Sequence, residues 1–325
     1  MMPIAEQISH AAALIRRGGV VAFPTETVYG LGANALDPRA VAKIFEIKER
    51  PFFDPLIVHI ADRDQLSELT PVHDPRVFRL IDAFWPGPLT LVLVRNSKVP
   101  DIVTAGLPTV AIRNPNHPVA LQLIREAGVP IAAPSANKFG RVSPTRARHV
   151  AKLHGVDMIL DGGDCSAGVE STIIALNPNG FTLLRPGCIT KEELEQYLPW
   201  SPDANLDVLS NARAPGMMKS HYSPAKALYF IGSEPEGLHP SKGGILVIGP
   251  PVPENFRKVI VLSNTFDLRE YAAGLFAALH EMEESDVEYI LVPPVEEKGL
   301  GLAIMDRLRK ASWRYNNERN FFNKF

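Results

Sequence analysis

The sequence predicts an α/β protein built of two domains. Two observations lead to this prediction: a length of 325 residues, and an alternation of strand-like and helix-like segments that fails in one stretch. A chain of this length exceeds one average domain, and such alternation is typical of α/β folds. We expect a larger domain over residues 1–198, a linker over 199–225 and a smaller open α/β domain of Rossmann-like type over 226–325.

The first domain begins with a helix–strand–helix pattern. An amphipathic helix ends near residues 16–19, and an apolar strand follows at 20–23. Asp37 and Pro38 then provide an N-cap and a first-turn proline for a helix that runs to about Lys48. Further strands are expected at residues 56–60, 89–94, 109–113, 131–133, 158–161, 172–176 and 182–185.

Ser143 and Pro144 repeat the cap-and-proline signal, so we expect a helix from Ser143 to about residue 153. Between residues 198 and 225 the periodicity fails, and Pro, Asn, Ser and Gly are frequent, which indicates a linker. The small domain then follows. Its expected strands lie at 228–231, 245–248, 259–262 and 289–292, and its helices at 267–284 and 302–312.

The charge balance argues against a protein that grips a nucleic-acid backbone. The chain has 34 basic and 36 acidic residues, a formal net charge of -2 and a pI of about 6.5. Nucleic-acid-binding proteins usually carry a basic surplus. We therefore expect no stable direct binding of nucleic acid.

The cysteines and the apolar runs bear on the cellular compartment. Cys165 and Cys188 have neither zinc-site nor disulfide-framework spacing, which is typical of a reducing environment. The N-terminal apolar run is too short and too interrupted for a signal peptide, and no later stretch is long enough to span a membrane. We expect a cytoplasmic protein without membrane association.

The first candidate site is the segment FPTETVYGLGA at residues 23–33. Threonine hydroxyls and glycine backbone directly after a buried strand are typical of ligand-binding ends of α/β sheets. The run from Gly30 to Ala35 also fits a loose GxGxxA dinucleotide pattern, but the following helix starts only at Asp37, so no glycine opens it. A tight structural turn explains this segment equally well.

The second candidate site is KERPFFDPLIVH at residues 48–59. Lys48 and Arg50 flank the end of a helix, where cations complement the helix dipole. Both are also suited to charge-assisted contacts with phosphate. His59, inside a strand, is by default a partly exposed strand histidine.

Three further segments carry polar residues beside expected strands. Arg113 follows three apolar strand residues and is placed either to clamp a carboxylate or to cap the sheet edge. The segment APSAN at 133–137 with SPT at 143–145 offers small residues, hydroxyls and an expected helix N-terminus, which favours phosphate. The pair GVEST at 168–172 and RPG at 185–187 completes the set.

No phosphate loop of the GxxxxGK[ST] type, GxSxG elbow, HExxH or kinase signature is present in the sequence. The remaining Arg, Lys, Ser and Thr lack an obvious nucleophile and base. Such an inventory suits a reaction whose reactants supply their own nucleophile, as in nucleotidyl transfer, where positioning and charge neutralisation carry most of the catalysis.

Taken in order, these motifs resemble the YrdC-type threonylcarbamoyl-AMP synthases. The resemblance rests on FPTETVYGLGA, KxRP followed by PLIVHI, PGPLTLVL, TVAIR, APSAN with SPT, GVEST and LRPG, and covers about residues 5–190. HYSP at residues 221–224 and the trailing α/β domain resemble the longer, two-domain form of the family. The ordered set is highly specific.

The resemblance implies a twisted mixed sheet around a deep, positively charged cavity. It also implies a nucleotidyltransferase reaction, in which L-threonine and bicarbonate give N-carboxy-threonine. The new carboxylate attacks the α-phosphate of ATP, expected with magnesium, and pyrophosphate leaves. The threonylcarbamoyl-AMP then passes to a threonylcarbamoyl-transferase complex that modifies tRNA.

The resemblance also divides the candidate residues between the two substrates, with Arg113 expected to clamp the threonine carboxylate. The residues expected at L-threonine are Thr27, His59, Arg113, Ala133 and Ser171. The residues expected at ATP are Lys48, Arg50, Asp54, Thr109, Ser135, Ser143, Arg185 and Tyr222. Lys48 and Arg50 are expected to stabilise charge, and no residue is assigned as nucleophile or proton donor. Asp54 stands where the family commonly has Asn, so it is expected to act through magnesium or to leave ATP untouched.

Two other functions remain as alternatives. An RNA-binding module would show strongly salt-dependent RNA binding. A regulatory protein that binds ATP without turnover would release no pyrophosphate. Tyr222 likewise has two explanations: it covers bound nucleotide as part of a lid, or it packs between the domains.

Overall fold

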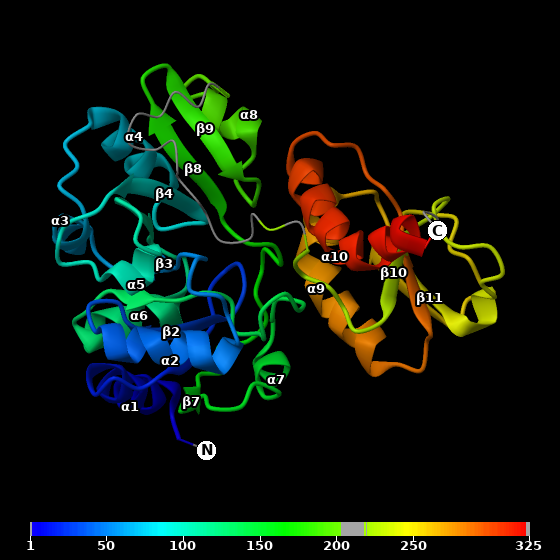
Figure 1. Ribbon diagram of the computed structural model, residues 1–325, viewed down its shortest axis with the longest axis horizontal. Coiled ribbons are helices and arrows are strands. Elements are labelled where there is room, and N and C mark those ends of the chain that lie inside the picture. Colours follow the sequence, from blue (N-terminus) through cyan, green and yellow to red (C-terminus); the bar gives the residue numbers. More distant parts are fainter. Residues whose placement is uncertain (1, 203–217, 219, 323–325) are drawn as a thin grey trace.

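The computed structural model describes residues 2–202, 218 and 220–322, and there the α/β prediction is confirmed. Figure 1 shows a larger body, coloured blue to green, beside a smaller one, coloured yellow to red. Most of the expected linker, residues 203–217 and 219, lies outside the described residues. No helix among the described residues is both long and apolar enough to cross a membrane.

The larger body is organised around one mixed sheet of nine strands in the order β7-β1-β2-β6-β3-β5-β4-β8-β9. Some neighbours pair in parallel, such as β3 with β5, and others pair antiparallel, such as β4 with β5. The strands are β1 Val21–Phe23, β2 Gly30–Asn34, β3 Ile57–His59, β4 Leu89–Val94, β5 Thr109–Arg113, β6 Ile131–Ala132, β7 Met158–Ile159, β8 Thr172–Asn177 and β9 Gly180–Arg185.

Helices cover this sheet and bury its apolar side chains. Helices α1 and α6 pack against each other and close one apolar cluster, and α2 and α4 contribute to the main core. The helices of this body are α1 Ile4–Arg16, α2 Pro38–Lys48, α3 Leu66–Leu69, α4 Pro75–Phe84, α5 Asp101–Thr104, α6 Pro118–Ala127, α7 Ala147–Val150 and α8 Lys191–Glu195. A short 3-10 helix, η1 Arg63–Gln65, precedes α3.

One of the two cap-and-proline signals is confirmed and the other is wrong. The Asp37 side chain accepts a hydrogen bond from the Arg39 amide and caps α2 as expected. The helix expected to start at Ser143 does not form, and only the one-turn α7 lies in that region. The Ser143 hydroxyl donates instead to a carboxylate oxygen of Glu170 at 2.7 Å, and the Pro144 carbonyl accepts from the Tyr29 amide. Tertiary partners have replaced the local cap.

The glycines of the GxGxxA pattern lie in strand β2, which the sequence did not predict. A Cβ at Gly32 would lie 2.6 Å from the Phe23 ring and 2.7 Å from Ile131 Cγ2. Glycine is therefore required where neighbouring strands pack closely. Since no helix begins at these glycines, the dinucleotide interpretation is excluded.

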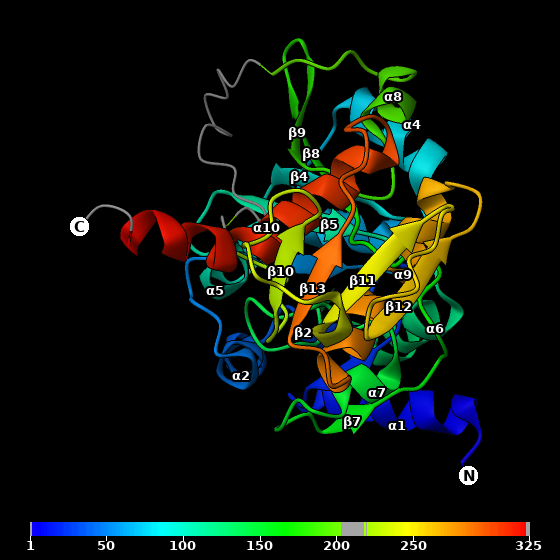
Figure 2. The ribbon, with the colours of Figure 1, turned by 90° about the vertical axis from the view of Figure 1, so that its right-hand side faces the viewer.

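The smaller body is a parallel sheet of four strands in the order β10-β13-β11-β12. Figure 2 shows this sheet in front of its two long helices, which therefore lie between the sheet and the larger body. The strands are β10 Ala227–Phe230, β11 Gly243–Ile248, β12 Lys258–Ser263 and β13 Tyr289–Val292. The helices are η2 Pro240–Lys242, α9 Leu268–Glu284 and α10 Leu300–Phe322, the last longer than expected.

The two bodies share one apolar core. Val28, Val142 and Val169 of the larger body belong to the same buried cluster as Tyr222 and Phe276. Buried apolar area is the main stabilising contribution to such a contact. The helices of the small domain are thereby held against the loops that follow β1 and precede β8, where the candidate motifs lie.

Candidate active site

The candidate motifs meet around one cavity at this contact. Its wall comes from the turn after β1, the ends of β3 and β5, the loop after β6, the ends of β8 and β9, and the segment that leads into the small domain. The lining residues are Thr25, Thr27, Val28, Gly30, Arg50, Ile57, His59, Arg113, Ala133, Pro134, Ser135, Glu170, Ser171, Arg185, His221 and Tyr222.

The turn between β1 and β2 is both a tight turn and part of this wall. The Thr25 hydroxyl accepts from the amides of Thr27 and Val28 and donates to the Val28 carbonyl. The Glu26 carbonyl accepts from the Ala167 amide at 2.8 Å, which ties the turn to a distant loop. Because the turn fixes itself through Thr25, the Thr27 hydroxyl is held in place at the cavity.

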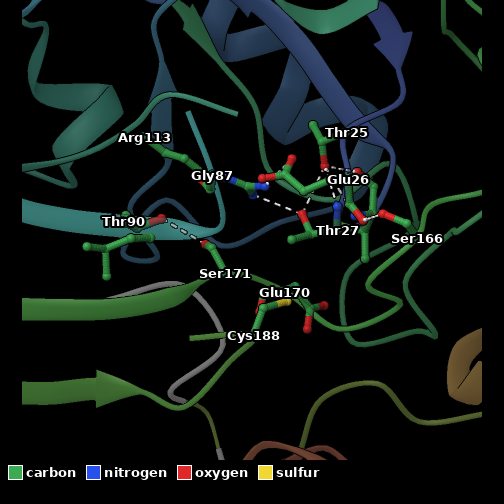
Figure 3. Close-up of polar contacts among 12 residues, drawn as sticks. Thr25, Glu26, Thr27, Gly87, Thr90, Arg113, Ser166, Glu170, Ser171 and Cys188 are labelled. Carbon is green, nitrogen blue, oxygen red and sulfur yellow. Dashed lines mark hydrogen bonds and ion pairs between the residues drawn. The ribbon is translucent and has the colours of Figure 1, made fainter. Parts of the chain in front are cut away.

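Arg113 ends a central strand and carries its guanidinium to the cavity. Strand β5 lies between β3 and β4, so the alternative that Arg113 caps a sheet edge is wrong. Its Nη1 donates to the Thr27 hydroxyl at 2.9 Å, and its Nε donates to the Gly87 carbonyl at 3.3 Å. Its Nη2 lies 2.7 Å from a carboxylate oxygen of Glu26. Figure 3 shows these partners around one guanidinium.

His59 pairs with Arg113 across the parallel strands β3 and β5 and lies beside it at the wall. The default interpretation of a partly exposed strand histidine is wrong, because His59 is buried. Burial, and then the charge of Arg113, lower the pKa of His59 to about 3. Its imidazole is therefore neutral at pH 7 and adds no charge to the cavity.

Ser171 and Arg185 are joined to each other near the start of β8. Arg185 Nε and Nη2 donate to the Ser171 carbonyl, and Nη2 also lies 3.1 Å from the Ser171 hydroxyl. That hydroxyl also shares a hydrogen bond of 2.8 Å with the Thr90 hydroxyl. The antiparallel pairing of β8 and β9 brings the GVEST and LRPG motifs together at the cavity.

Arg50 lines the cavity, whereas Asp54 and Lys48 stand behind it. Arg50 forms an ion pair of 2.9 Å with Asp54 and donates to the Pro55 carbonyl. The Lys48 amine donates to the carbonyls of Ser135 and Asn137 and so holds the loop after β6. Burial, followed by the charge of Arg50, lowers the pKa of Lys48 well below its usual value.

A buried ion pair joins the two bodies at the cavity wall. Glu170 lines the cavity, and its second carboxylate oxygen lies 2.7 Å from Nε of Arg307 on α10. Arg307 also donates to the Pro186 carbonyl at 3.0 Å. Burial alone would raise the pKa of Glu170, but the charges of Arg307 and Arg185 and the bond from Ser143 hold it at about 2. The carboxylate is ionised at neutral pH.

Tyr222 packs between the domains, as one of its two interpretations predicts, whereas its role as part of a lid over nucleotide stays a prediction. It lines the cavity beside His221, and its ring also stacks on Phe276 of α9 with 5.5 Å between centroids. The guanidinium of Arg307 lies 5.2 Å from the same ring. Burial lowers the pKa of His221 to about 3 against the opposing charge of Glu170, so this imidazole is neutral as well.

The structure brings most of the expected site residues together. Those at the cavity wall are Thr27, Arg50, His59, Arg113, Ala133, Ser135, Ser171, Arg185 and Tyr222. The others are buried nearby or farther away: Lys48, Asp54 and Ser143 each bond to a wall residue, whereas Thr109 begins β5, four positions before Arg113. What each residue binds stays a prediction.

Three charged residues around the cavity were not predicted from the sequence. Glu26 and Glu170 lie inside candidate motifs, between or beside hydroxyl residues. Their positions could therefore have marked them as residues near the site. Arg307 lies in a helix far from every motif and reaches Glu170 over 137 positions. Nothing in the local sequence indicates that contact.

Comparison with known proteins agrees with this geometry. A family model described as telomere recombination (Sua5_yciO_yrdC) matches residues 13–187, and the model of the threonylcarbamoyl-AMP synthase C-terminal domain (Sua5_C) matches residues 189–312. Threonylcarbamoyl-AMP synthase of Pyrococcus abyssi is 44% identical, covering 94% of both chains. That of Bacillus subtilis is 46% identical, covering 94% of this chain and 93% of its own. The chain belongs to the threonylcarbamoyl-AMP synthase family.

Solved structures extend the likeness to the whole architecture. The crystal structure of P. abyssi Sua5 complexed with L-threonine has 42% sequence identity and a TM-score of 0.84, and covers 96% of this chain and 95% of its own. The resemblance to the two-domain form of the family is therefore confirmed. As a member of the threonylcarbamoyl-AMP synthase family, this chain is an enzyme of the nucleotidyltransferase type.

Proposed function

We propose that the cavity holds L-threonine at its Arg113 end and ATP along Arg50 and Arg185. The observation that carries the proposal is the convergence of these three arginines on one wall, where Glu170 is the single carboxylate among the described lining residues. A cavity of this charge favours polyanions and carboxylates. The relative solved with L-threonine, so similar over its whole length, supports threonine as the occupant of one end.

At the threonine end, we assign the amino acid's carboxylate to Arg113 and its remaining polar groups to neighbouring hydroxyls. Thr27 and Ser171 present hydroxyls there, and the neutral His59 offers a further polar contact. Ala133 contributes a small side chain next to the wall. Arg113 is held by Thr27 and Gly87, so its fork keeps a fixed direction for a planar carboxylate.

At the other end, we assign the phosphates of ATP to Arg50 and Arg185, with Ser135 and Tyr222 as further contacts. Charge builds up on the α-phosphate as the carboxylate of N-carboxy-threonine attacks and pyrophosphate leaves. Fixed cations that face this charge stabilise the transition state without rearrangement. The substrates supply the nucleophile, so the mechanism requires no nucleophilic side chain, and bicarbonate supplies the carbon that becomes the carbamoyl group.

Magnesium enters this proposal with the nucleotide. No group of three His, Cys, Asp or Glu side chains that could hold a metal ion occurs within the part of the chain that the structure describes. Glu170 and Asp54 are each paired with an arginine. These residues do not form a resident metal site, so we expect the phosphates to carry the ion, and Asp54 to act mainly on Arg50.

The product is a mixed anhydride, which is prone to hydrolysis. We propose that it is passed in the cytoplasm to a threonylcarbamoyl-transferase complex that modifies tRNA. The free thiols of Cys165 and Cys188 support a reducing compartment. We expect Tyr222, which packs between the cavity and α9, to exclude water from the nucleotide.

The test is a complete reaction from which each substrate is omitted in turn. Purified protein with magnesium-ATP, L-threonine and bicarbonate should release pyrophosphate and form threonylcarbamoyl-AMP, and each omission should stop both. ATP binding without pyrophosphate release would indicate a regulator and contradict the proposal. Strongly salt-dependent binding of RNA in place of turnover would favour an RNA-binding module.

A further inference from the structure

Glu26 is a buried carboxylate that contacts Arg113 away from the cavity. Thr25 and Thr27 on either side of it line the cavity, but Glu26 does not. Both of its carboxylate oxygens are buried, and neither makes a hydrogen bond to the part of the chain that the structure describes. One of them lies 2.7 Å from Arg113 Nη2, and Figure 3 shows the two groups facing each other.

The direction of the Arg113 side chain does not depend on Glu26. Nη1 and Nε are fixed by hydrogen bonds to the Thr27 hydroxyl and the Gly87 carbonyl. The contact between Nη2 and Glu26 is close, but its alignment is not that of a hydrogen bond. What Glu26 supplies to Arg113 is therefore mainly a negative charge in a poorly solvated place, where charges act strongly.

A compensated arginine binds polyanions less strongly than a bare one. The cavity that Arg113 shares with Arg50 and Arg185 would otherwise attract polyphosphate over its whole length. L-threonine is a zwitterion, so a nearby negative charge opposes its carboxylate but favours its ammonium group. Pyrophosphate carries only negative charge, so the negative charge of Glu26 opposes its binding without any compensating attraction.

We propose that Glu26 is a specificity-determining residue: its buried charge keeps the Arg113 end selective for a zwitterionic amino acid over polyphosphate. This inference rests on the proposed division of the cavity between threonine and ATP. Glu26 acts through Arg113 and does not touch the substrate. Its removal should strengthen anion binding, whereas a residue that only positioned Arg113 would weaken binding when removed.

The test compares Glu26→Gln, which removes the charge at constant shape, with Glu26→Asp, which keeps the charge but is shorter. Dissociation constants of L-threonine and of pyrophosphate are measured separately by calorimetry on the full chain. We expect Glu26→Gln to bind pyrophosphate roughly 10-fold more tightly and L-threonine at most about threefold more tightly. Glu26→Asp should stay near the wild type for both ligands.

A matched control removes a negative charge elsewhere. Asp62→Asn breaks an exposed pair with Arg125 and should leave both constants unchanged. If Glu26→Gln is unstable, the same affinities follow from the rise of its melting temperature with ligand concentration. Unchanged or weaker pyrophosphate binding by Glu26→Gln overturns the inference, as does an equal gain of pyrophosphate binding in Glu26→Asp.

Arg113→Met separates this inference from the proposed function. Loss of threonine binding in Arg113→Met, together with no gain in pyrophosphate binding when Glu26→Gln is added, supports both. Normal threonine binding in Arg113→Met would show that the division of the cavity is wrong, whatever Glu26 does. Loss of threonine binding combined with a full pyrophosphate gain in the double variant would overturn only the role of Glu26.

Discussion

The two ends of the cavity are built in different ways. At the end that we assign to threonine, all the partners of Arg113 named above belong to the larger domain: Thr27 and Gly87 hold the guanidinium, and Glu26 supplies the charge beside it. The other end includes Glu170 and Tyr222, which the small domain holds through Arg307 and Phe276. With the cavity divided as we propose, we expect recognition of the amino acid to depend on one domain, and the nucleotide end to be complete only when both domains are in contact.

The largest expected effect is a loss of stability when the ion pair between the two domains is broken. Glu170→Ala removes the cavity-wall partner of the buried Arg307 and leaves it with Asp306 as its remaining carboxylate, and breaking a buried pair costs at most about 3–5 kcal/mol. We expect urea titrations to show a fall in the free energy of unfolding toward the lower end of this range, because Asp306 still compensates Arg307. The control is Arg309→Ala on the same helix, whose exposed pair with Glu297 should contribute less than about 1 kcal/mol. A similarly small loss in Glu170→Ala would contradict this account.

The next effect concerns turnover at the nucleotide end. Arg50→Ala removes a cation that lines the cavity, and we expect a loss of roughly 2–4 kcal/mol of transition-state stabilisation. Lys48→Ala should also lower turnover, because its amine holds the carbonyls of Ser135 and Asn137 at the wall. The measurement is kcat/KM for pyrophosphate release by folded variants. Near-normal turnover in both would show that this end is assigned wrongly.

A third variant tests whether the ends are separate. Arg113→Ala should weaken threonine binding by roughly 1.5–3 kcal/mol, the range for a hydrogen bond to a charged group, and change ATP binding much less. Calorimetric titration of each substrate measures the two losses. Equal losses, or a loss confined to ATP, would mean that the ends are not divided as proposed.

A smaller effect is expected at Tyr222, which belongs both to the cavity wall and to the domain contact. Tyr222→Ala should weaken ATP retention and raise the ratio of free AMP to intact threonylcarbamoyl-AMP, because water then reaches the anhydride. Chromatography of the reaction products measures that ratio. Tyr222→Phe keeps the stacking on Phe276 and serves as the control. An unchanged product ratio in Tyr222→Ala would show that Tyr222 packs between the domains without protecting the anhydride.

The smallest effect concerns acid and the domain contact. His149 of α7 and His280 of α9 stack with 4.0 Å between ring centroids. Burial, and then the neighbouring histidine and arginine charges, lower the pKa of His149 to about 3, and burial lowers that of His280 to about 4. Both are neutral in the folded protein, so their stability contribution is complete above about pH 6.5 and is lost as the pH falls toward 4.

Urea titrations between pH 7 and pH 5 measure this loss. His149→Asn removes one titrating group of the pair, so its free energy of unfolding should fall less with acid than that of the wild type. An identical pH dependence in both proteins would show that the pair does not sense acid.

Much of the fold could be predicted because its signals are local. Asp37 with Pro38 starts α2 as expected, and Asp74 with Pro75 carries the same signal for α4, which the prediction omitted. Strand β2 was missed because glycine disfavours strands locally, and only its packing against Phe23 explains it.

The site was predictable where motif residues point into the cavity, and not where partners come from afar. Three motif arginines line the wall, and so do the hydroxyl residues Thr27, Ser135 and Ser171. The carboxylates that compensate those arginines could not be paired from sequence, because Glu26 lies in the turn after β1, and β1 and β5 are not neighbouring strands. Ser143 shows the same limit: its sequence predicts a helix cap, but its hydroxyl instead donates a hydrogen bond to the distant Glu170.

The ion pair between Glu170 and Arg307 also sets an order in time. Ribosomes add about 5–20 residues per second, so the 137 positions between the two partners take roughly 7–27 s to synthesise. During that interval the motifs of the larger domain already exist, but the arginine that pairs with Glu170 does not. A nascent chain therefore cannot complete the end of the cavity that we assign to the nucleotide until helix α10 has left the ribosome.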